Sequence, residues 1–491
     1  MRANDRVYTL RARLDPCVLG YILLCLATSV SSFGRPAAEA AVPVLMTSDI
    51  HFEPFWDPGK AAELVAAPAA KWKAILAAPA SPDREQRFAD LAQACHARGA
   101  DTSYPLLASS LEAMRTNADG IKFVTVSGDL ISHSFDCKFR TVFPKAGPAD
   151  YSAFVEKTVE FVVGSLRETF KGVPVYAALG NNDTDCADYK LDANSKFLAS
   201  VGKTIAADLP PSERDEAEKD FAAGGYFSVR LPAPIRDARL LVLDDLFMAR
   251  KYSTCSGKPD DAAAAAEISW LKQQLEEARL KKEKVWVMAH IPPGVDPYST
   301  ATSGKDICAG AEPQMFLSSE SLADTMAEFG DVIRLGIFAH THMDEMRLLE
   351  PVKPSQAHGP VAVKMVASIS PIDGNNPSFT VARVDPASAD LADYRVIAAS
   401  DGTGMDTRWA EEYDYAETYH EPSFSSASLE KLTSEFTADP QADSAESEAY
   451  LRNYFVKDRS FELRFFWPQY VCAVLNHTEG AYRSCVCPVK Q

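Results

Sequence analysis

The sequence of 491 residues lacks several features that would indicate its class directly. It has no C-x-x-C pair of the kind that suggests a structural zinc site, and it has no internal repeat. It also lacks an excess of positive charge, since its formal net charge is −18. Proteins that bind nucleic acid nonspecifically neutralise phosphates with clustered Lys and Arg, so we expect no nucleic-acid partner.

The sequence also lacks an apolar run long enough to span a membrane. The apolar stretch Cys17–Val30 is shorter than the roughly 20 residues that a transmembrane helix needs. It follows the Arg-containing segment Met1–Arg13 and precedes small residues ending in Ala38–Ala40. This order predicts a cleaved secretory signal over residues 1–40. We therefore expect a secreted, periplasmic, lysosomal or vacuolar protein without a stable membrane span after cleavage.

Ten cysteines are present, and two of them, Cys17 and Cys25, would leave with the signal. The remaining eight form an even number, which permits disulfide bonds in an exported chain. Their pairing cannot be deduced from the sequence.

Short apolar runs that end in polar residues alternate with helical patterns from Val42 onward. Continuous β-rich runs are typical of strands covered on both faces, and their alternation with helices predicts an α/β domain over residues 41–400. Helices are expected at Tyr151–Thr169 and Ala262–Leu280. The predicted strands lie in Val42–Asp49, Lys122–Asp129, Val173–Asn181, Leu240–Asp245, Val285–His290 and Arg334–His340.

The strand pattern stops beyond Ser400, where aromatic residues become frequent in 408–424 and 461–470. This change predicts a smaller, mainly helical C-terminal subdomain over residues 401–491, which also contains cysteines. Aromatic stripes are more often core than binding site, so we expect these side chains in the core. The Ala-rich segment Pro58–Asn117 is predicted to be a helical insertion over the site.

The predicted strands end at an Asp, Asn or His. The carboxyl ends of strands are where α/β folds assemble ligand sites. Imidazole and carboxylate groups with one amide oxygen suit divalent ions such as Zn, Mn or Fe. Taken singly, each Asp would be a helix cap and each His a core residue. Seven donors exceed one ion's needs, so we expect two ions that share a carboxylate and hold a bridging hydroxide for attack on phosphorus. The candidate ligands are Asp49, His51, Asp129, Asn181, His290, His340 and His342.

The order of these motifs resembles the calcineurin-like metallophosphoesterases. The motifs are SDIH, SGDL, GNND, MAHIPPG and AHTH. Within that family, AHIPPG, DTSYPLL, SISPIDGNNPSF and the aromatic tail are similar to the acid sphingomyelinase-like phosphodiesterases. The resemblance implies a four-layer α/β/β/α sandwich of two sheets flanked by helices, and two divalent ions, with zinc expected.

The resemblance also implies a role for each site residue. Asp129 would bridge the two ions. His133, four residues further on, matches a histidine near the phosphate and would hydrogen-bond the phosphoryl oxygens. In this assignment one ion is held by Asp49, His51 and His342, and the other by Asn181, His290 and His340.

Asn182 departs from the family pattern, as does Ala339, which replaces the usual Gly. Most relatives carry His at position 182, where an imidazolium protonates the leaving alkoxide, and an amide cannot act as an acid. Three accounts stay open: His133 or a metal-bound water donates the proton, the leaving group departs unaided as it does from a phosphoanhydride, or the enzyme is slow. The GNND form resembles endopolyphosphatases, which favours the second account.

We therefore predict a secreted dinuclear-metal hydrolase of phosphodiesters that resembles sphingomyelin phosphodiesterase. Its substrate would be a small molecule, a lipid headgroup or polyphosphate. Only Ala41–Ser48 separate the predicted cleavage point from Asp49, so we expect no saposin domain, which favours soluble substrates. The alternatives are an endopolyphosphatase, a nucleotide phosphodiesterase or another anhydride hydrolase, and, from another class, a binding protein on a hydrolase scaffold. The sequence does not indicate the oligomeric state.

Overall fold

The computed structural model describes residues 40–351, 359–456 and 460–487. The predicted signal segment, residues 1–40, lies outside the described residues except for Ala40. Within the described ranges no helix combines the length and the apolar character that crossing a membrane requires.

The first sheet is built around the N-terminal strand, and its order is β12-β11-β10-β1-β2-β3. The pairs β1–β2 and β2–β3 are parallel, whereas β10 pairs antiparallel with β1. Three neighbouring strands therefore present their carboxyl ends at one edge. The strands are β1 (Val42–Thr47), β2 (Val124–Ser127), β3 (Val175–Ala178), β10 (Ser378–Val384), β11 (Leu391–Ala399) and β12 (Trp409–Asp414).

The second sheet has the order β4-β5-β6-β7-β9-β8. Its central pairs β5–β6, β6–β7 and β7–β9 are parallel. It therefore also has a single edge where carboxyl ends gather. The strands are β4 (Phe227–Arg230), β5 (Ala238–Val242), β6 (Lys284–Met288), β7 (Ile333–Phe338), β8 (Glu345–Leu349) and β9 (Val361–Met365).

The two sheets share one hydrophobic core. Trp286 of β6 is fully buried and packs edge-on against Phe123, next to β2, with 5.8 Å between the ring centroids. Its indole N–H donates to the Ala389 carbonyl at 2.8 Å, so the one polar atom of this large side chain is satisfied. Burying aromatic rings of this size contributes much of the free energy that holds the sheets together.

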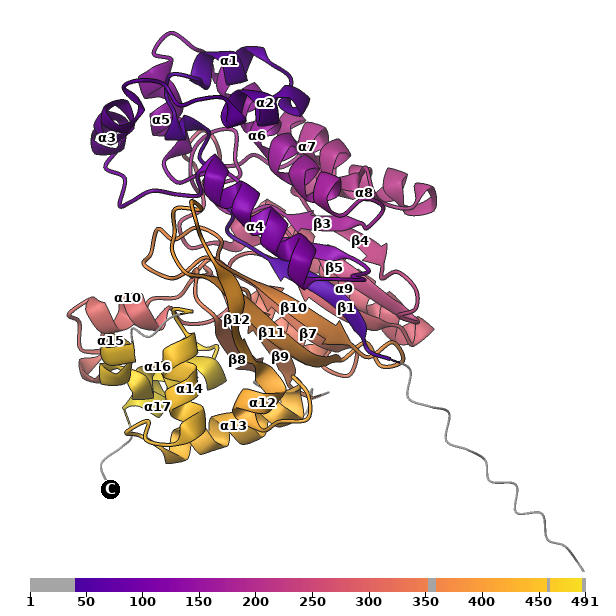
Figure 1. Cartoon of the computed structure of the whole chain (residues 1–491). Coiled ribbons are helices and arrows are strands. Elements are labelled where there is room, and N and C mark those ends of the chain that lie inside the picture. Colours follow the sequence, from indigo (N-terminus) through magenta and orange to yellow (C-terminus); the bar gives the residue numbers. More distant parts are fainter. Residues whose placement is uncertain (1–39, 352–358, 457–459, 488–491) are drawn as a thin grey trace, which may run out of the picture. The chain divides into compact units, whose positions relative to one another are not determined.

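Helices cover both sheets, which confirms the predicted α/β sandwich (Figure 1). On the first sheet α6 and α7 contact β3, and on the second sheet α9 contacts β6. The helices predicted at Tyr151–Thr169 and Ala262–Leu280 correspond to α6 and α9. The helices are α1 (Ala61–Ala66), α2 (Trp72–Ala77), α3 (Arg84–Ala94), α4 (Tyr104–Asn117), α5 (Phe135–Val142), α6 (Pro148–Thr169), α7 (Lys196–Ala206), α8 (Pro211–Gly224), α9 (Ala262–Lys281), α10 (Pro297–Thr302), α11 (Ser321–Glu328), α12 (Tyr415–Tyr419), α13 (Ser426–Ala438), α14 (Ala445–Asn453), α15 (Ser460–Phe465), α16 (Trp467–Leu475) and α17 (Glu479–Val486).

One strand lies beyond Ser400, so the prediction that strands end there is wrong in this detail. Strand β12 pairs antiparallel with β11 at the margin of the first sheet. Only one of its six residues is buried, because an edge strand needs no continuous apolar run. The helices α12 to α17 follow it and lie together at the lower left of Figure 1.

Eight cysteines of the described chain form four disulfide bonds. One of them, Cys308–Cys487, joins residues that are 179 positions apart and fastens the end of α17 to the loop before α11. The other three are Cys95–Cys137, Cys186–Cys255 and Cys472–Cys485.

The Cys308–Cys487 bond should be a major contributor to stability, because closing a long loop restricts the unfolded chain most. We expect Cys308→Ser to lower the free energy of unfolding by about 2 to 5 kcal/mol. The measurement is thermal unfolding followed by circular dichroism. The double variant with Cys487→Ser should be no less stable than Cys308→Ser alone, and a clearly additive loss would contradict the assigned pairing.

Candidate metal centre

The predicted ligands leave the carboxyl ends of the strands at the edge that the two sheets share. Because both sheets are largely parallel in their centres, these ends converge. The first sheet supplies Asp49 and His51 after β1, Asp129 after β2 and Asn181 after β3, and the second supplies His290 after β6 and His340 and His342 after β7.

The chain holds most of these residues in an unfavourable backbone conformation. Non-glycine residues rarely adopt the left-handed region, and such strain is concentrated at functional sites. It occurs here at Asp49 (φ 44°), His51 (φ 43°), Asp129 (φ 52°), His340 (φ 72°) and His342 (φ 68°).

Four of the predicted ligands form a first buried cluster. The Nε2 atom of His51 lies 3.1 Å from Nε2 of His342 and 3.4 Å from Oδ2 of Asp129. Asp49 Oδ1 lies 3.5 Å from the same His342 nitrogen. All four side chains are at most 2% exposed, so water cannot solvate these facing atoms.

A second cluster shares one oxygen atom with the first. His290 Nε2 lies 3.1 Å from Asp129 Oδ2, 3.2 Å from Asn181 Oδ1 and 3.3 Å from His340 Nδ1. The oxygen common to both clusters is Asp129 Oδ2. The structure therefore brings all seven predicted ligands together in two groups that meet at this carboxylate.

These donor atoms fit divalent cations. Asp49 Oδ1 is fully buried and has no hydrogen-bond partner, which is costly unless something binds it. His51 donates from Nδ1 to the Ile131 carbonyl at 2.9 Å, and His290 donates from Nδ1 to the Ser127 carbonyl at 2.8 Å. When either ring is neutral, the lone pair of its Nε2 faces its cluster, which is the orientation that a metal ligand needs.

The electrostatics of the centre also favour a bound cation. Burial lowers the pKa of His51 and of His290, but the neighbouring Asp129 raises these pKa values to about 9 and about 10. Burial raises the pKa of Asp129, yet the two histidines hold it well below its ordinary value. Protons on two buried histidines therefore balance the carboxylate, and a divalent cation would supply the same balance.

Asn182 lies beside the shared carboxylate. Its backbone N–H donates to Asp129 Oδ1 and its side-chain amide donates to Asp129 Oδ2, both at 2.9 Å. With 5% of its surface exposed, the side chain serves to hold Asp129 in place.

His133 adjoins the first cluster. Its ring stacks on the His51 ring with 3.9 Å between centroids, and its Nδ1 faces Asp101 Oδ1 at 3.0 Å. Burial raises the pKa of Asp101, but interactions with His133, His51 and Lys138 hold it below its ordinary value. Sequence reasoning missed Asp101 as a partner, although the DTSYPLL motif begins with it.

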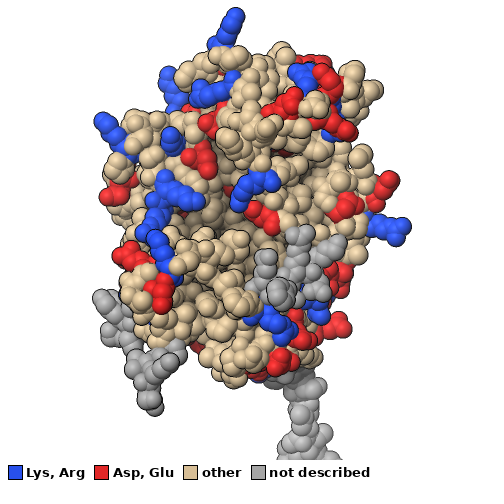
Figure 2. Space-filling model, turned by 90° about the vertical axis from the view of Figure 1, so that its left-hand side faces the viewer, with Lys and Arg blue, Asp and Glu red and all other residues tan. Residues whose placement is uncertain are grey.

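The clusters open into a cavity of about 760 Å³. Three aromatic residues of the C-terminal part, Tyr454, Phe455 and Tyr470, line it. Tyr470 is also buried in the hydrophobic core, as expected for this aromatic tail. Helix α10 also borders the cavity, and Figure 2 views the molecule from the side where α10 lies in Figure 1. On that face basic and acidic side chains are interspersed around a hollow.

Gly180 and Gly128 leave room for the close approach of the shared carboxylate and His290. A Cβ on Gly180 would lie 2.2 Å from Asp129 Oδ1, and a Cβ on Gly128 would lie 2.8 Å from His290 Nδ1. We expect Gly180→Ala to displace Asp129 and to lower kcat/KM for a phosphoester about 100-fold. The matched control is Gly164→Ala in α6, where a Cβ meets no atom within 4 Å. Unchanged kcat/KM in both variants would contradict the assigned geometry.

Comparison with known proteins agrees with this site. Residues 42–344 match the family model described as calcineurin-like phosphoesterase. The mouse (Mus musculus) protein named cyclic GMP-AMP phosphodiesterase SMPDL3A is 24% identical over 402 residues, which cover 79% of this chain and 82% of that protein. Human (Homo sapiens) acid sphingomyelinase-like phosphodiesterase 3b is 24% identical over 413 residues, which cover 79% of this chain and 80% of that protein. The endopolyphosphatase of Schizosaccharomyces pombe is 27% identical over 257 residues, which cover 51% of this chain and 39% of that protein.

The family match includes every predicted ligand and spans more than half of the chain. The resemblance read from the sequence is thereby confirmed. The chain belongs to the calcineurin-like phosphoesterase family, whose members use divalent metals, and it is a phosphoric ester hydrolase.

Proposed function

We propose that the chain is an exported phosphodiesterase with two divalent metal ions, most simply zinc. The observation that carries this proposal is the pair of buried donor clusters that share Asp129 Oδ2. These residues would hold two divalent ions, which when bound would supply charge stabilisation for the phosphate and activate water for in-line displacement. Four disulfide bonds support an oxidising destination, which is a lumen, a periplasm or the medium.

The chain's own residues hold and orient the reacting groups. Asn182 fixes both oxygens of Asp129, so the two clusters keep one geometry. Asp101 accepts a hydrogen bond from Nδ1 of His133, which leaves Nε2 of that ring for the cavity that His133 lines. His133 can therefore hydrogen-bond a phosphoryl oxygen or hold the proton that a poor leaving group needs.

The cavity lining favours diesters with organic groups over long polyanions. Two cationic residues, Arg98 and Lys251, line it, together with several carboxylates beyond the ligand Asp129. Its aromatic side chains offer surfaces on which flat or alkyl groups can pack. The carboxylates are Asp188, Asp296, Glu345 and Asp373, and the aromatic residues are Tyr189, Tyr298, Phe316, Tyr454, Phe455 and Tyr470.

The proposal is tested by counting metal ions and measuring turnover on the same protein. We expect about two equivalents of zinc per chain by mass spectrometry, and hydrolysis of bis(p-nitrophenyl) phosphate that a chelator abolishes and zinc restores. Asp129→Ala should retain less than one equivalent and lose at least about 1000-fold in kcat.

The variant's circular dichroism spectrum must match that of the wild type. A folded wild-type protein that binds two ions but hydrolyses no phosphodiester would contradict the proposal. A protein that binds no metal would instead support a binding role on a hydrolase scaffold.

Hydrolysis of phosphoanhydrides, as by an endopolyphosphatase, is the second candidate, and one observation favours it. Asn182 occupies the position from which relatives donate a proton, and its amide is committed to Asp129. An anhydride releases a phosphate that needs no such proton, whereas loss of general acid catalysis costs a poor leaving group about 10² to 10⁴ in rate.

Replacing Asn182 with His should therefore restore a proton donor. We expect Asn182→His to raise the rate on alkyl phosphodiesters by more than it raises the rate on phosphoanhydrides. Initial rates on a dialkyl phosphate and on long-chain polyphosphate provide the comparison, and Asn182→Gln controls for side-chain size. An equal change on both substrates would refute the assigned role.

A further inference from the structure

The side chain of Asn181 is held by an acidic residue of its own loop. Asn181 Nδ2 donates to Asp188 Oδ1 at 2.7 Å, while Oδ1 of the same amide lies 3.2 Å from His290 Nε2 in the second cluster. An ionised carboxylate accepts hydrogen bonds and cannot donate them. Asp188 therefore selects the orientation in which the amide turns its N–H groups away from the cluster and its oxygen, the atom that can bind a cation, toward it.

The loop that carries Asp188 closes back on Asn181. The Tyr189 backbone N–H donates to the Asn181 carbonyl at 3.0 Å, and the Tyr189 hydroxyl lies 3.3 Å from Nε2 of His340. Two consecutive residues of this loop thus contact two candidate ligands of the same cluster. A displacement of the loop would disturb both ligands.

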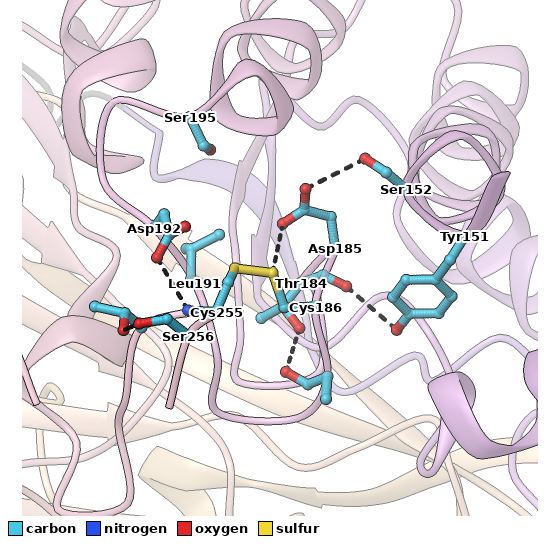
Figure 3. The surroundings of a disulfide bond; sticks show 12 residues. Tyr151, Ser152, Thr184, Asp185, Cys186, Leu191, Asp192, Ser195, Cys255 and Ser256 are labelled. Carbon is cyan, nitrogen blue, oxygen red and sulfur yellow. Dashed lines mark hydrogen bonds between the residues drawn. A yellow bond between two sulfur atoms is a disulfide. The ribbon is translucent and has the colours of Figure 1, made fainter. Parts of the chain in front are cut away.

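A disulfide bond fastens the loop in place. Cys186, two residues before Asp188, is bonded to Cys255 (Figure 3). The backbone N–H of Cys255 donates to Asp192 Oδ1 at 2.9 Å, beyond Asp188 in the sequence. The backbone is therefore held on both sides of Asp188, which keeps the carboxylate within reach of the amide.

The charge of Asp188 is balanced inside the cavity. Asp188 and Lys251 both line the cavity, and their side chains attract each other electrostatically. Asp129 acts in the opposite sense, because two carboxylates repel each other. Lys251 therefore favours the ionised form of Asp188, which is the stronger hydrogen-bond acceptor for the Asn181 amide.

We propose that Asp188 is a positioning residue of the second cluster and sets the affinity of that cluster for a metal ion through the Asn181 amide. This inference rests on the proposed function, because it concerns one of the two ions that the function requires. Partners of metal ligands commonly change metal affinity or activity by about 10- to 100-fold. Asp188 needs no contact with the substrate for such an effect.

Zinc affinity tests the proposal without turnover. Titration calorimetry on the metal-free protein should resolve two binding events, and Asp188→Ala should weaken one of them about tenfold or more while leaving the other within about twofold. Asp188→Asn keeps an oxygen that can accept from Asn181, so it should recover part of the lost affinity. The matched control is Asp185→Asn, which removes a charge from the same loop at a residue that faces Ser152 (Figure 3) and should leave both affinities within about twofold.

The zinc dependence of turnover separates positioning from substrate contact. The Asp188→Ala enzyme should need about tenfold more zinc for half-maximal hydrolysis of bis(p-nitrophenyl) phosphate, and saturating zinc should restore kcat to within about threefold of the wild-type value. A loss of kcat that added zinc does not restore would overturn the positioning role.

A swapped pair of residues tests the contact itself in the metal-free protein. Asn181→Asp alone places two carboxylates face to face and should lower the melting temperature. Adding Asp188→Asn pairs a donor with an acceptor again and should recover most of that loss, whereas no recovery would overturn the proposal. A wild type that binds fewer than two zinc ions would contradict the proposed function, and the melting temperatures of the swapped pair would still decide whether Asp188 holds Asn181.

Discussion

The centre depends on keeping the carboxylate of Asp129 ionised although its side chain is almost fully buried. A buried, unpaired carboxylate is too costly to persist, so the surrounding chain must provide compensation. Asn182 provides one hydrogen bond from its backbone N–H and one from its side-chain amide. The facing nitrogens of His51 and His290 provide the rest. The need for close approach at this carboxylate also explains why position 180 carries glycine.

The left-handed backbone at five of the seven candidate ligands has a related cause. A regular strand would continue past the sheet edge and carry these side chains apart. A residue with positive φ turns the chain immediately and aims its side chain back over the strand ends. The conformational strain is offset by the packed sandwich below, in which the buried rings of Trp286 and Phe123 are in contact.

Six strands could be predicted because they form continuous apolar runs, whereas β8, β9 and β10 are also buried but were not among the predictions. The runs that became β1, β2, β3, β5, β6 and β7 are continuous and apolar, and each predicted strand is present. Strand β12 has no such run, since it lies at an edge and buries only one of its six residues. Many C-terminal aromatics followed the general preference for the core, and two core residues, Tyr454 and Tyr470, also border the cavity.

The candidate ligands could be predicted because each follows a strand within a short motif. Their supporting residues could not, since Asp101, Asp373 and Tyr189 come from loops whose course is set by tertiary packing. Two of them stand inside stretches that already resembled relatives, DTSYPLL and SISPIDGNNPSF. A polar residue in such a motif that no strand explains is therefore a candidate partner of a ligand.

Tyr470 in α16 and the residues Tyr454 and Phe455 after α14 form an aromatic part of the cavity lining. Their position in the sequence bears on how the enzyme can evolve. The metal centre is assembled from strand ends in the first 342 residues, whereas part of the wall facing the substrate comes from residues beyond 450. Part of the surface that faces a substrate is thus encoded apart from the candidate ligands. Sequence changes near the 3′ end of the gene can reshape that part of the cavity while the candidate ligands stay unchanged.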